Sequence, residues 1–231
     1  FLRSCLGIPA LRAGDIVDTF GLDTFKVLDE HPDLLDTVPG MDEVAKENLL
    51  SAWGYARATV ELSSFLSDHD VTSSQVRAIL SEFGVGATKL IRDNPYRLVE
   101  VDNFPFVKAD DIARGVGVGQ NDPRRYEGAV LWVLRETTSS GHLCLRRGDV
   151  AMTLRGLVEG SPVDAFDSPI FSDEVAKAIG RLESSNRVVV DPNVGVYLPQ
   201  HYYHEREAAR LLVQFMGESS FDIKADDFLT T

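Results

Sequence analysis

The stretches FGLDTFKVLDEHPDLLDTVPGM at residues 20–41 and FGVGATKLIRDNPYRLVEVDNF at residues 83–104 align without a gap, at a constant offset of 63 positions. Phe20-Gly21 recurs as Phe83-Gly84, and the apolar positions that follow stay in step. Two long segments with apolar residues at the same helical spacing are typical of an internal repeat. The sequence therefore predicts a duplicated helical unit, with residues 1–60 and 64–117 folding alike.

Each copy is predicted to contain two helical hairpins. In the first copy, Gly7-Ile8 precedes one amphipathic run and Gly40-Met41-Asp42 precedes another. This spacing resembles the helix-hairpin-helix motif, in which glycines with positive φ let main-chain N–H groups at a helix N-terminus hold a nucleic-acid phosphate. The resemblance implies DNA-binding residues in the first copy at Gly7, Ile8, Arg12, Gly40 and Lys46.

The motif is altered at several positions. Pro9 and Asp42 replace the second glycine of the two hairpins, and in the second copy Asp70-Val71-Thr72 and Asn103-Phe104-Pro105 keep neither glycine. Proline has no N–H to offer, and an aspartate repels phosphate. A second interpretation therefore stays open, in which the hairpins are compact packing units that do not touch DNA.

Composition narrows the class of protein. The chain has 231 residues with 44% apolar content, enough for two or three small domains. No apolar run approaches the roughly 18 residues that span a bilayer, and no signal peptide is evident, so we expect no membrane partner. The two cysteines lie far apart, which favours a reduced, cytoplasmic location. The first residue is Phe1, so the chain is expected to be a piece of a longer protein.

Charge is unevenly distributed along the chain. The formal net charge is -13, which disfavours a simple nucleic-acid binder. Residues 1–60 hold five Lys or Arg against ten Asp or Glu, whereas residues 106–155 hold eight against six. If DNA contacts this chain, we expect the basic middle to contribute most. Its candidate DNA-binding residues are Lys108, Arg124, Arg125, Arg146 and Arg147.

Beyond residue 118 the pattern changes from helices alone to helices and strands. Asn121-Asp122-Pro123 is a helix start, because Asp or Asn can cap and Pro suits the first turn. The expected elements are helices at 124–137, 149–158 and 172–184, a short strand at 142–145, a β-hairpin at 187–198 and a helix from 204 to 216. Helices followed by a hairpin suggest a winged-helix arrangement, although these elements allow other packings.

The predicted fold class is therefore mainly α, with duplicated helix-hairpin-helix units followed by a small α+β domain with a β-hairpin. The expected domains are a first hairpin pair, a second hairpin pair, a winged-helix-like domain and the start of a following domain or tail. Their boundaries are 1–62, 63–118, 119–200 and 201–231.

The order of the motifs resembles the N-terminal region of stand-alone RecD-like DNA helicases, relatives of the exodeoxyribonuclease V alpha subunit. The residues that carry the resemblance are the two repeats, then the run 106–113, Asp122-Pro123-Arg124-Arg125, Gly141-His142, Val196-Tyr197-Leu198-Pro199 and Glu205. In that family the region precedes an ATP-dependent, 5′ to 3′ translocating helicase core. The resemblance implies a DNA-processing parent in repair or recombination, with ATP and Mg as the parent's cofactors. The implied partners are DNA, single-stranded or at a junction, and the helicase core itself.

No residues of this chain suggest catalysis. Nothing reads Gly-Lys-Ser/Thr, so the phosphate-binding loop for ATP is absent from the sequence, and we expect no cofactor here. Asp110-Asp111 are adjacent on a predicted helix and would point in different directions, as solvated or capping charges do. Among the aromatic residues, Tyr96 is the one expected to be exposed for base stacking. Two functions remain open, namely a DNA-binding accessory region of a helicase and a scaffold whose acidic hairpins dock a partner or the core.

Overall fold

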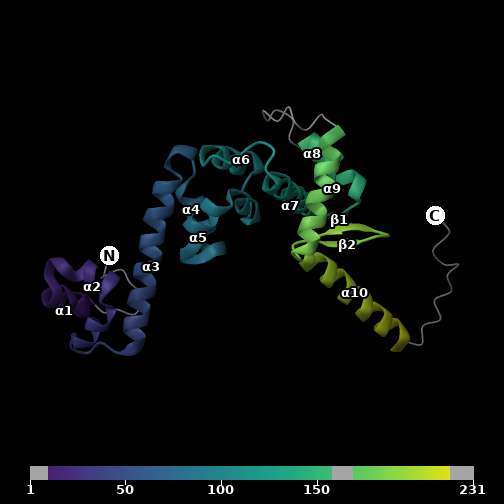
Figure 1. Ribbon diagram of the computed structural model, residues 1–231. Coiled ribbons are helices and arrows are strands. Elements are labelled where there is room, and N and C mark those ends of the chain that lie inside the picture. The colour runs from purple at the N-terminus through teal and green to yellow at the C-terminus, as the bar shows by residue number, and fades with distance from the viewer. Residues whose placement is uncertain (1–9, 158–168, 219–231) are drawn as a thin grey trace. The chain divides into compact units, whose positions relative to one another are not determined.

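The computed structural model describes residues 10–157 and 169–218, with side chains described within 13–154 and 173–216 (Figure 1). The described residues are mainly helical and include one small antiparallel sheet, which confirms the predicted fold class. They form two compact units. The first takes the chain up to Phe104 together with Asp111–Val116, and the second takes Pro105–Asp110 and the chain from Gly117 onward. The predicted division into four segments stays a prediction.

The repeat appears in the structure as two copies of the same element order. The first copy consists of α1 (Ala10–Phe20), the 3₁₀ turn η2 (Gly21–Asp23), α2 (Thr24–Glu30), the 3₁₀ helix η3 (Pro32–Thr37) and α3 (Glu43–Phe65). The second consists of α4 (Ser73–Phe83), η5 (Gly84–Gly86), α5 (Ala87–Asp93), η6 (Pro95–Glu100) and α6 (Phe106–Gly115). Every element of the second copy begins 63 positions after its counterpart. The predicted duplication of helix order is therefore confirmed.

The same positions are buried in both copies. The core of the first copy includes Ala13, Ile16, Leu28, Leu35, Val38 and Leu49. The residues 63 positions later are also buried, namely Val76, Ile79, Ile91, Leu98, Val101 and Ile112. Six apolar positions in the same register explain why two sequences with few identical residues adopt one arrangement, since similar apolar volumes can fill similar cores.

Helix α3 is longer than its counterpart α6 and serves both copies. Leu49 in its N-terminal half lies in the core of the first copy, while Ala58 and Leu62 are buried in its C-terminal half. The helix contacts α4, η5 and α5 of the second copy, and η4 (Ser67–His69) follows its end. Figure 1 shows α3 leading from the first copy to the second.

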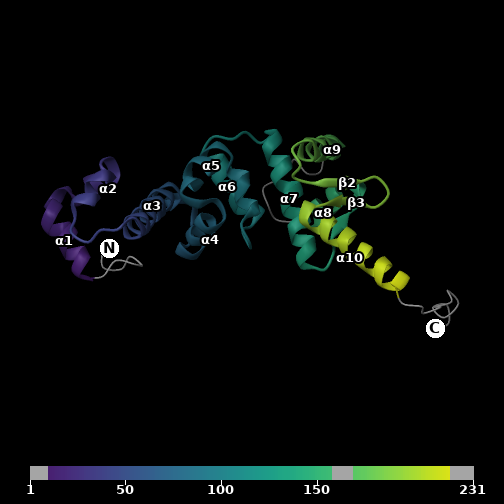
Figure 2. The ribbon, with the colours of Figure 1, turned by 90° about the horizontal axis from the view of Figure 1, so that it is seen from below.

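The second unit combines helices with the sheet. Its elements are α7 (Pro123–Ser139), β1 (Cys144–Leu145), α8 (Arg147–Leu157), α9 (Pro169–Ser184), β2 (Val189–Asp191), β3 (Gly195–Tyr197) and α10 (Pro199–Glu218). The strand order is β1-β3-β2, both pairings are antiparallel, and α7, α8 and α9 contact one another (Figure 2). A helix, a strand, two helices and a hairpin in this order make a winged-helix arrangement, one of the packings that the sequence allows.

Three predicted helix starts in this unit are shifted. α8 begins at Arg147 and carries Asp149 in its first turn, whereas the sequence predicted a helix from residue 149. α9 and α10 begin at Pro169 and Pro199, earlier than predicted, because proline fits the first helical position, where its missing N–H costs nothing. The start of α7 is as predicted, with Asp122 as N-cap and Pro123 in the first turn.

Candidate nucleic-acid interface

Three turns that precede the second helix of a hairpin share a left-handed backbone. Gly40, which precedes α3, has φ 73°, and its counterpart Asn103, which precedes α6, has φ 57°. Asp70, which precedes α4, has φ 50° and is the counterpart of Gly7. Asn and Asp adopt this region more readily than other residues with a side chain. The second copy thus keeps the geometry of the motif although it has lost both glycines.

One main-chain donor in the first turn of α3, and one in the first turn of α4, already has a side-chain partner within the protein. The Asp42 carboxylate accepts a hydrogen bond from the Ala45 N–H at 2.8 Å. At the start of α4, Thr72 Oγ1 accepts from the Gln75 N–H, and the Gln75 side chain accepts from the Thr72 N–H, which is a capping box. Before α6, Pro105 has no N–H to donate. A phosphate that used the Ala45 or the Gln75 N–H would have to displace a side-chain oxygen.

Lys46, on the first turn of α3, points to an internal partner. Its Nζ lies 2.8 Å from Oδ1 of Asp36 and 3.0 Å from Oδ2. The hydrogen bond with Asp36 raises the pKa of Lys46, and the attraction of the same carboxylate adds to the effect. Gly40 is exposed beside it. The positive charge of Lys46 is therefore offset locally rather than presented alone.

Arg125 occupies a different environment from the one predicted. Its Nε donates to Asp110 Oδ1 at 2.8 Å and its Nη2 donates to Oδ2 at 3.0 Å, while Nη1 donates to the Gln120 carbonyl at 3.3 Å. Both charged side chains are almost wholly buried, 4% and 1% exposed. A guanidinium enclosed in this way has no open side for phosphate. The DNA contact of Arg125 stays a prediction, and the structure gives this side chain a buried carboxylate partner from α6.

Arg124 is held by the cap of its own helix. Its Nε and Nη2 donate to the two carboxylate oxygens of Asp122 at 2.9 and 2.7 Å. The hydrogen bond with Arg124 lowers the pKa of Asp122 below its ordinary value. Lys108, on α6, is half-buried and also interacts with other residues of the protein. Both cations therefore have internal partners.

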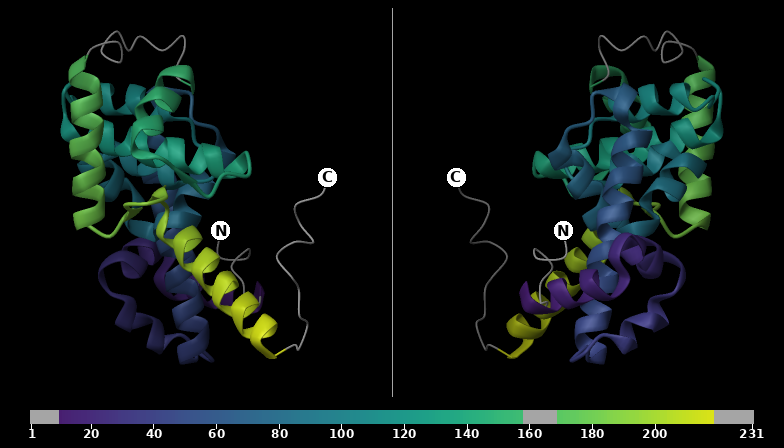
Figure 3. Two further views of the ribbon diagram at one scale, coloured as in Figure 1. Left: turned by 90° about the vertical axis from the view of Figure 1, so that its right-hand side faces the viewer. Right: turned by 90° about the vertical axis from the view of Figure 1, so that its left-hand side faces the viewer.

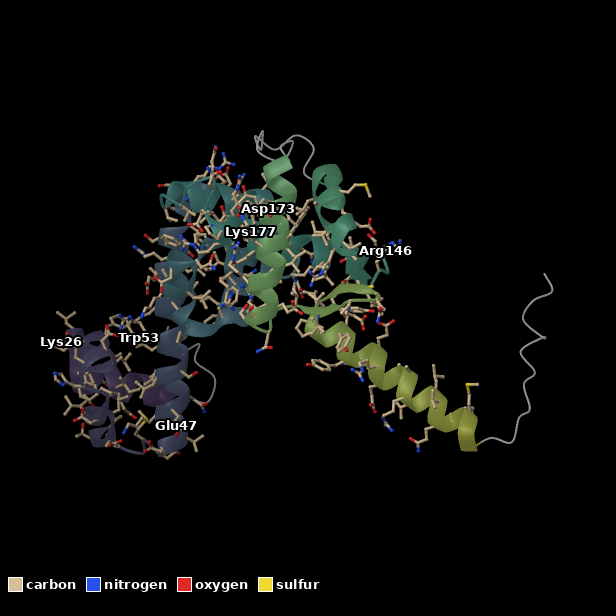
Figure 4. All side chains as sticks on the ribbon, turned by 45° about the vertical axis from the view of Figure 1, so that its right-hand side comes forward. Lys26, Glu47, Trp53, Arg146, Asp173 and Lys177 are labelled. Carbon is tan, nitrogen blue, oxygen red and sulfur yellow. The ribbon has the colours of Figure 1, made fainter. Side chains whose placement is uncertain are left out.

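The remaining basic pair lies where β1 leads into α8. Arg146 is exposed and makes no ion pair with any residue in the described part of the chain, and it lies at the outer edge of the second unit (Figure 4). The Arg147 side chain is 62% exposed, and its Nη2 lies 3.8 Å from Glu183 Oε2, a loose contact. Of the ten predicted residues, these two most fit a phosphate contact.

Three predicted residues cannot be placed. Gly7 and Ile8 lie outside the described residues, and the side chain of Arg12 is not described although its backbone forms part of α1. The candidate interface therefore rests on the remaining positions.

The first half of α9 is acidic, which sequence reasoning did not detect. Lys177 Nζ lies 2.8 Å from Asp173 Oδ2 and 2.8 Å from Glu174 Oε1 (Figure 4). The hydrogen bonds with these two carboxylates raise the pKa of Lys177. One cation beside two anions leaves this face net negative. The spacing of these residues at i, i+3 and i+4 is visible in the sequence and could have revealed the pairing.

Two further expectations have clear outcomes. Tyr96 is only 2% exposed, because η6 packs against α5, so the prediction of an exposed stacking face is wrong. Asp110 and Asp111 have different partners, in line with the predicted difference in direction, and the exposed Asp111 pairs with His69 at 3.1 Å. The expectation of a solvated or capping charge is wrong for Asp110, which is 1% exposed and paired with Arg125. Within the part of the chain that the structure describes, no cluster of His, Cys, Asp and Glu could hold a metal ion. No helix there is long and apolar enough to cross a bilayer.

Comparison with known proteins supports the helix-hairpin-helix assignment of the second copy. Residues 55–144 match the family model described as the ATP-dependent RecD2 DNA helicase HHH domain. That region starts in the C-terminal half of α3 and ends at β1, so it contains the second copy of the repeat. The chain is also 27% identical over 237 aligned residues to the ATP-dependent RecD2 DNA helicase of Deinococcus radiodurans. The alignment covers 96% of this chain and 31% of that protein, so the chain spans about a third of the length of this curated relative.

The resemblance to the N-terminal region of RecD-like helicases is therefore confirmed. The chain is similar to a helicase-associated region and contains a helix-hairpin-helix domain of the RecD2 type.

Proposed function

We propose that this chain is a DNA-binding accessory region of an ATP-dependent RecD-like helicase that acts in DNA repair or recombination. The observation that carries the proposal is the match of residues 55–144 to the RecD2 helix-hairpin-helix domain, in a segment whose turns keep left-handed φ values at Asp70 and Asn103. ATP and Mg would be bound by another part of the parent, which translocates 5′ to 3′. Since such an enzyme works where the chromosome lies, we propose a cytoplasmic location.

The contact with DNA is proposed at Arg146 and Arg147. Two cations at the start of α8 face the positive end of the helix dipole, where anions are favoured, so they gain by meeting a negative partner. The phosphate backbone supplies such a partner, and each cation that meets a phosphate releases counterions. The helix before the β-hairpin, α9, is acidic in its first half and does not suit the groove of duplex DNA. Two exposed cations fit single-stranded or junction DNA that is held by its backbone.

The test is fluorescence anisotropy with labelled single-stranded and forked DNA across a range of salt concentrations. We expect Arg146→Ala with Arg147→Ala to weaken binding regardless of sequence and to reduce the slope of log affinity against log salt by up to about two units. The matched control is Arg124→Gln with Lys177→Gln, which removes the same charge from cations that have internal partners.

The two pairs of substitutions separate local contacts from net charge. Equal losses in both variants would assign the effect to overall charge. Binding by the parent protein that neither pair alters would return Arg146 and Arg147 to structural roles.

A second candidate is a protein-interaction scaffold. The caps at Asp42 and Thr72 each occupy one main-chain donor that a phosphate could use, and Lys46 is offset by Asp36. With its excess of acidic residues, the first copy could dock a basic partner or the helicase core. This candidate predicts no salt-dependent DNA affinity for the isolated chain, while the chain still associates with the core.

A further inference from the structure

Helix α10 carries a cluster of exposed apolar side chains over its last two turns. Leu211, Leu212, Val213, Phe215 and Met216 are each between 51% and 70% exposed. The beginning of the helix is anchored differently, because the Tyr202 ring packs edge-on at 5.4 Å against Tyr197 of β3. Figure 1 shows α10 leaving the sheet and extending away from the other helices of its unit. Exposed apolar patches of this extent mark interaction surfaces in proteins.

The apolar residues cover more of the helix than a simple amphipathic stripe. With about 100° per residue, Ala208, Ala209 and the five residues of the cluster cover an arc of about 200°. A two-stranded coiled coil needs only a narrow seam, and a helix on a protein surface needs a stripe of about 100°. An arc twice as wide fits a helix that is enclosed by a folded domain. The pairing of α10 with α10 of a second copy would cover only part of this arc, so we do not take it as the best explanation.

The polar side of the same turns needs no partner. Arg210 donates to both carboxylate oxygens of Glu207, at 2.9 and 2.7 Å, and to Gln214 Oε1 at 3.2 Å. These hydrogen bonds run along one side of the helix, which is a single continuous rod (yellow in Figure 3). The exposed apolar surface of these turns lies on the other side of the helix.

The comparison with the Deinococcus protein indicates what can enclose the helix. The alignment covers 96% of this chain, so about nine residues lie outside it, and α10 ends 13 residues before the last residue. α10 is thus inside the matched region, while the relative has more than twice as much sequence outside the match as inside it. That protein is named as ATP-dependent, and no Gly-Lys-Ser/Thr occurs in this chain.

We propose that the C-terminal half of α10 is the docking surface for the ATP-hydrolysing core of the same polypeptide, which encloses Leu211, Leu212 and Phe215. This inference rests on the proposed function, since it takes the parent to be a RecD-like helicase. The helix would then belong structurally to the second unit at its start and to the core at its end. Any movement of the core would be transmitted directly to β3 through Tyr202.

Hydrogen exchange measured by mass spectrometry tests the proposal on the 231-residue chain and on the full-length parent. In the parent we expect the amides of residues 211–216 to exchange at least about tenfold more slowly than in the chain alone, because they become part of a folded core. Leu212→Asp with Phe215→Asp should abolish that protection while the amides of α7 stay protected. The control, Gln214→Glu on the polar side, should keep the protection.

Other results would overturn the proposal. Equal exchange in the chain and the parent, or protection that survives both aspartates, would show that the core does not enclose this helix. A dimer of the 231-residue chain in light scattering that the two aspartates dissociate would identify a second copy as the occupant. DNA affinity of the chain alone is measured in parallel, so a failure of the DNA-binding proposal is seen separately from a failure at α10.

Discussion

Among single residues, Arg125 shows how a buried carboxylate changes the role of a basic residue near a helix start. Arg125 lies in the first turn of α7, and its ion pair with Asp110 is buried. Both oxygens of the carboxylate are bonded to the guanidinium, and both groups are out of contact with water. Burying charge is costly, and the pair persists only because its geometry compensates for the lost hydration. Removing one partner leaves the other as an unpaired buried charge.

We expect Asp110→Ala to lower the free energy of unfolding by about 3–5 kcal/mol, since Arg125 would then be buried without its partner. The double variant Asp110→Leu with Arg125→Met should recover much of that loss, because two apolar residues need no hydration. Urea unfolding followed by circular dichroism gives both values. If Arg125 instead binds DNA, the double variant will lose DNA affinity at temperatures where it is fully folded.

Gly195 is a second residue whose role depends on a neighbouring strand, because its lack of a side chain lets β1 approach β3 closely. A Cβ at this position of β3 would lie 2.4 Å from the Leu145 carbonyl oxygen of β1, a contact that backbone atoms cannot relieve. Gly195→Ala should therefore separate β1 from β3 and destabilise the second unit by about 1–3 kcal/mol. Gly180→Ala in α9, where a Cβ meets nothing, should be neutral or stabilising in the same thermal unfolding assay. A neutral Gly195→Ala would contradict the close approach of these strands.

At the scale of elements, the hairpin turn rather than the glycine is what the two copies share. Gly40 and Asn103 hold equivalent left-handed positions before α3 and α6, although their side chains differ. The conformation is therefore set by the packing of the helices on either side. The residue type at the turn changes only the free-energy cost of the left-handed conformation.

Substitutions at these two turns test that account. Gly40→Val and Asn103→Val should each cost about 1–2 kcal/mol, because a β-branched residue disfavours positive φ. Gly40→Asn and Asn103→Gly should cost less than their valine counterparts, by chemical denaturation. Gly119→Val is the control, since its added side chain meets nothing and its φ is not left-handed. Similar costs for Val and Asn at position 40 would rule out backbone conformation as the cause.

For the molecule as a whole, the described residues present three features that suit contact with a partner. Its two units supply repeated hairpins, an exposed arginine pair before α8, and the apolar end of α10. The net charge of -13 means that any DNA contact must be local, since the average field repels phosphate. Activity that needs ATP would then depend on other parts of the parent.

We accordingly expect the 231-residue chain neither to bind nor to hydrolyse ATP in the presence of Mg. The sequence has no Gly-Lys-Ser/Thr, so it lacks the loop and the lysine that hold the β- and γ-phosphates. Isothermal titration calorimetry and a phosphate-release assay measure the two properties. Micromolar binding of ATP would show that the chain contains a nucleotide site of another kind.

The duplicated order of helices, the cap of α7 by Asp122 and the β2–β3 hairpin could all be predicted from the amino-acid sequence. These features depend on apolar spacing and on residues close together in the chain, such as Asp122 and Pro123, so a single sequence contains the necessary information. The match of buried positions at the 63-residue offset follows from the same periodicity.

Which side chains are exposed to a partner could not be predicted from the sequence, because it depends on how the elements pack. Arg125 and Arg146 look alike in the sequence, yet one is buried against Asp110 and the other is exposed. Tyr96 is buried for the same kind of reason, since η6 packs against α5. Residues from other helices and strands determine how buried each of these side chains is and which charges lie near it. The local sequence pattern does not contain the contacts between those elements. Local spacing fixes the elements, whereas the free energy of packing them together selects the residues left for a partner.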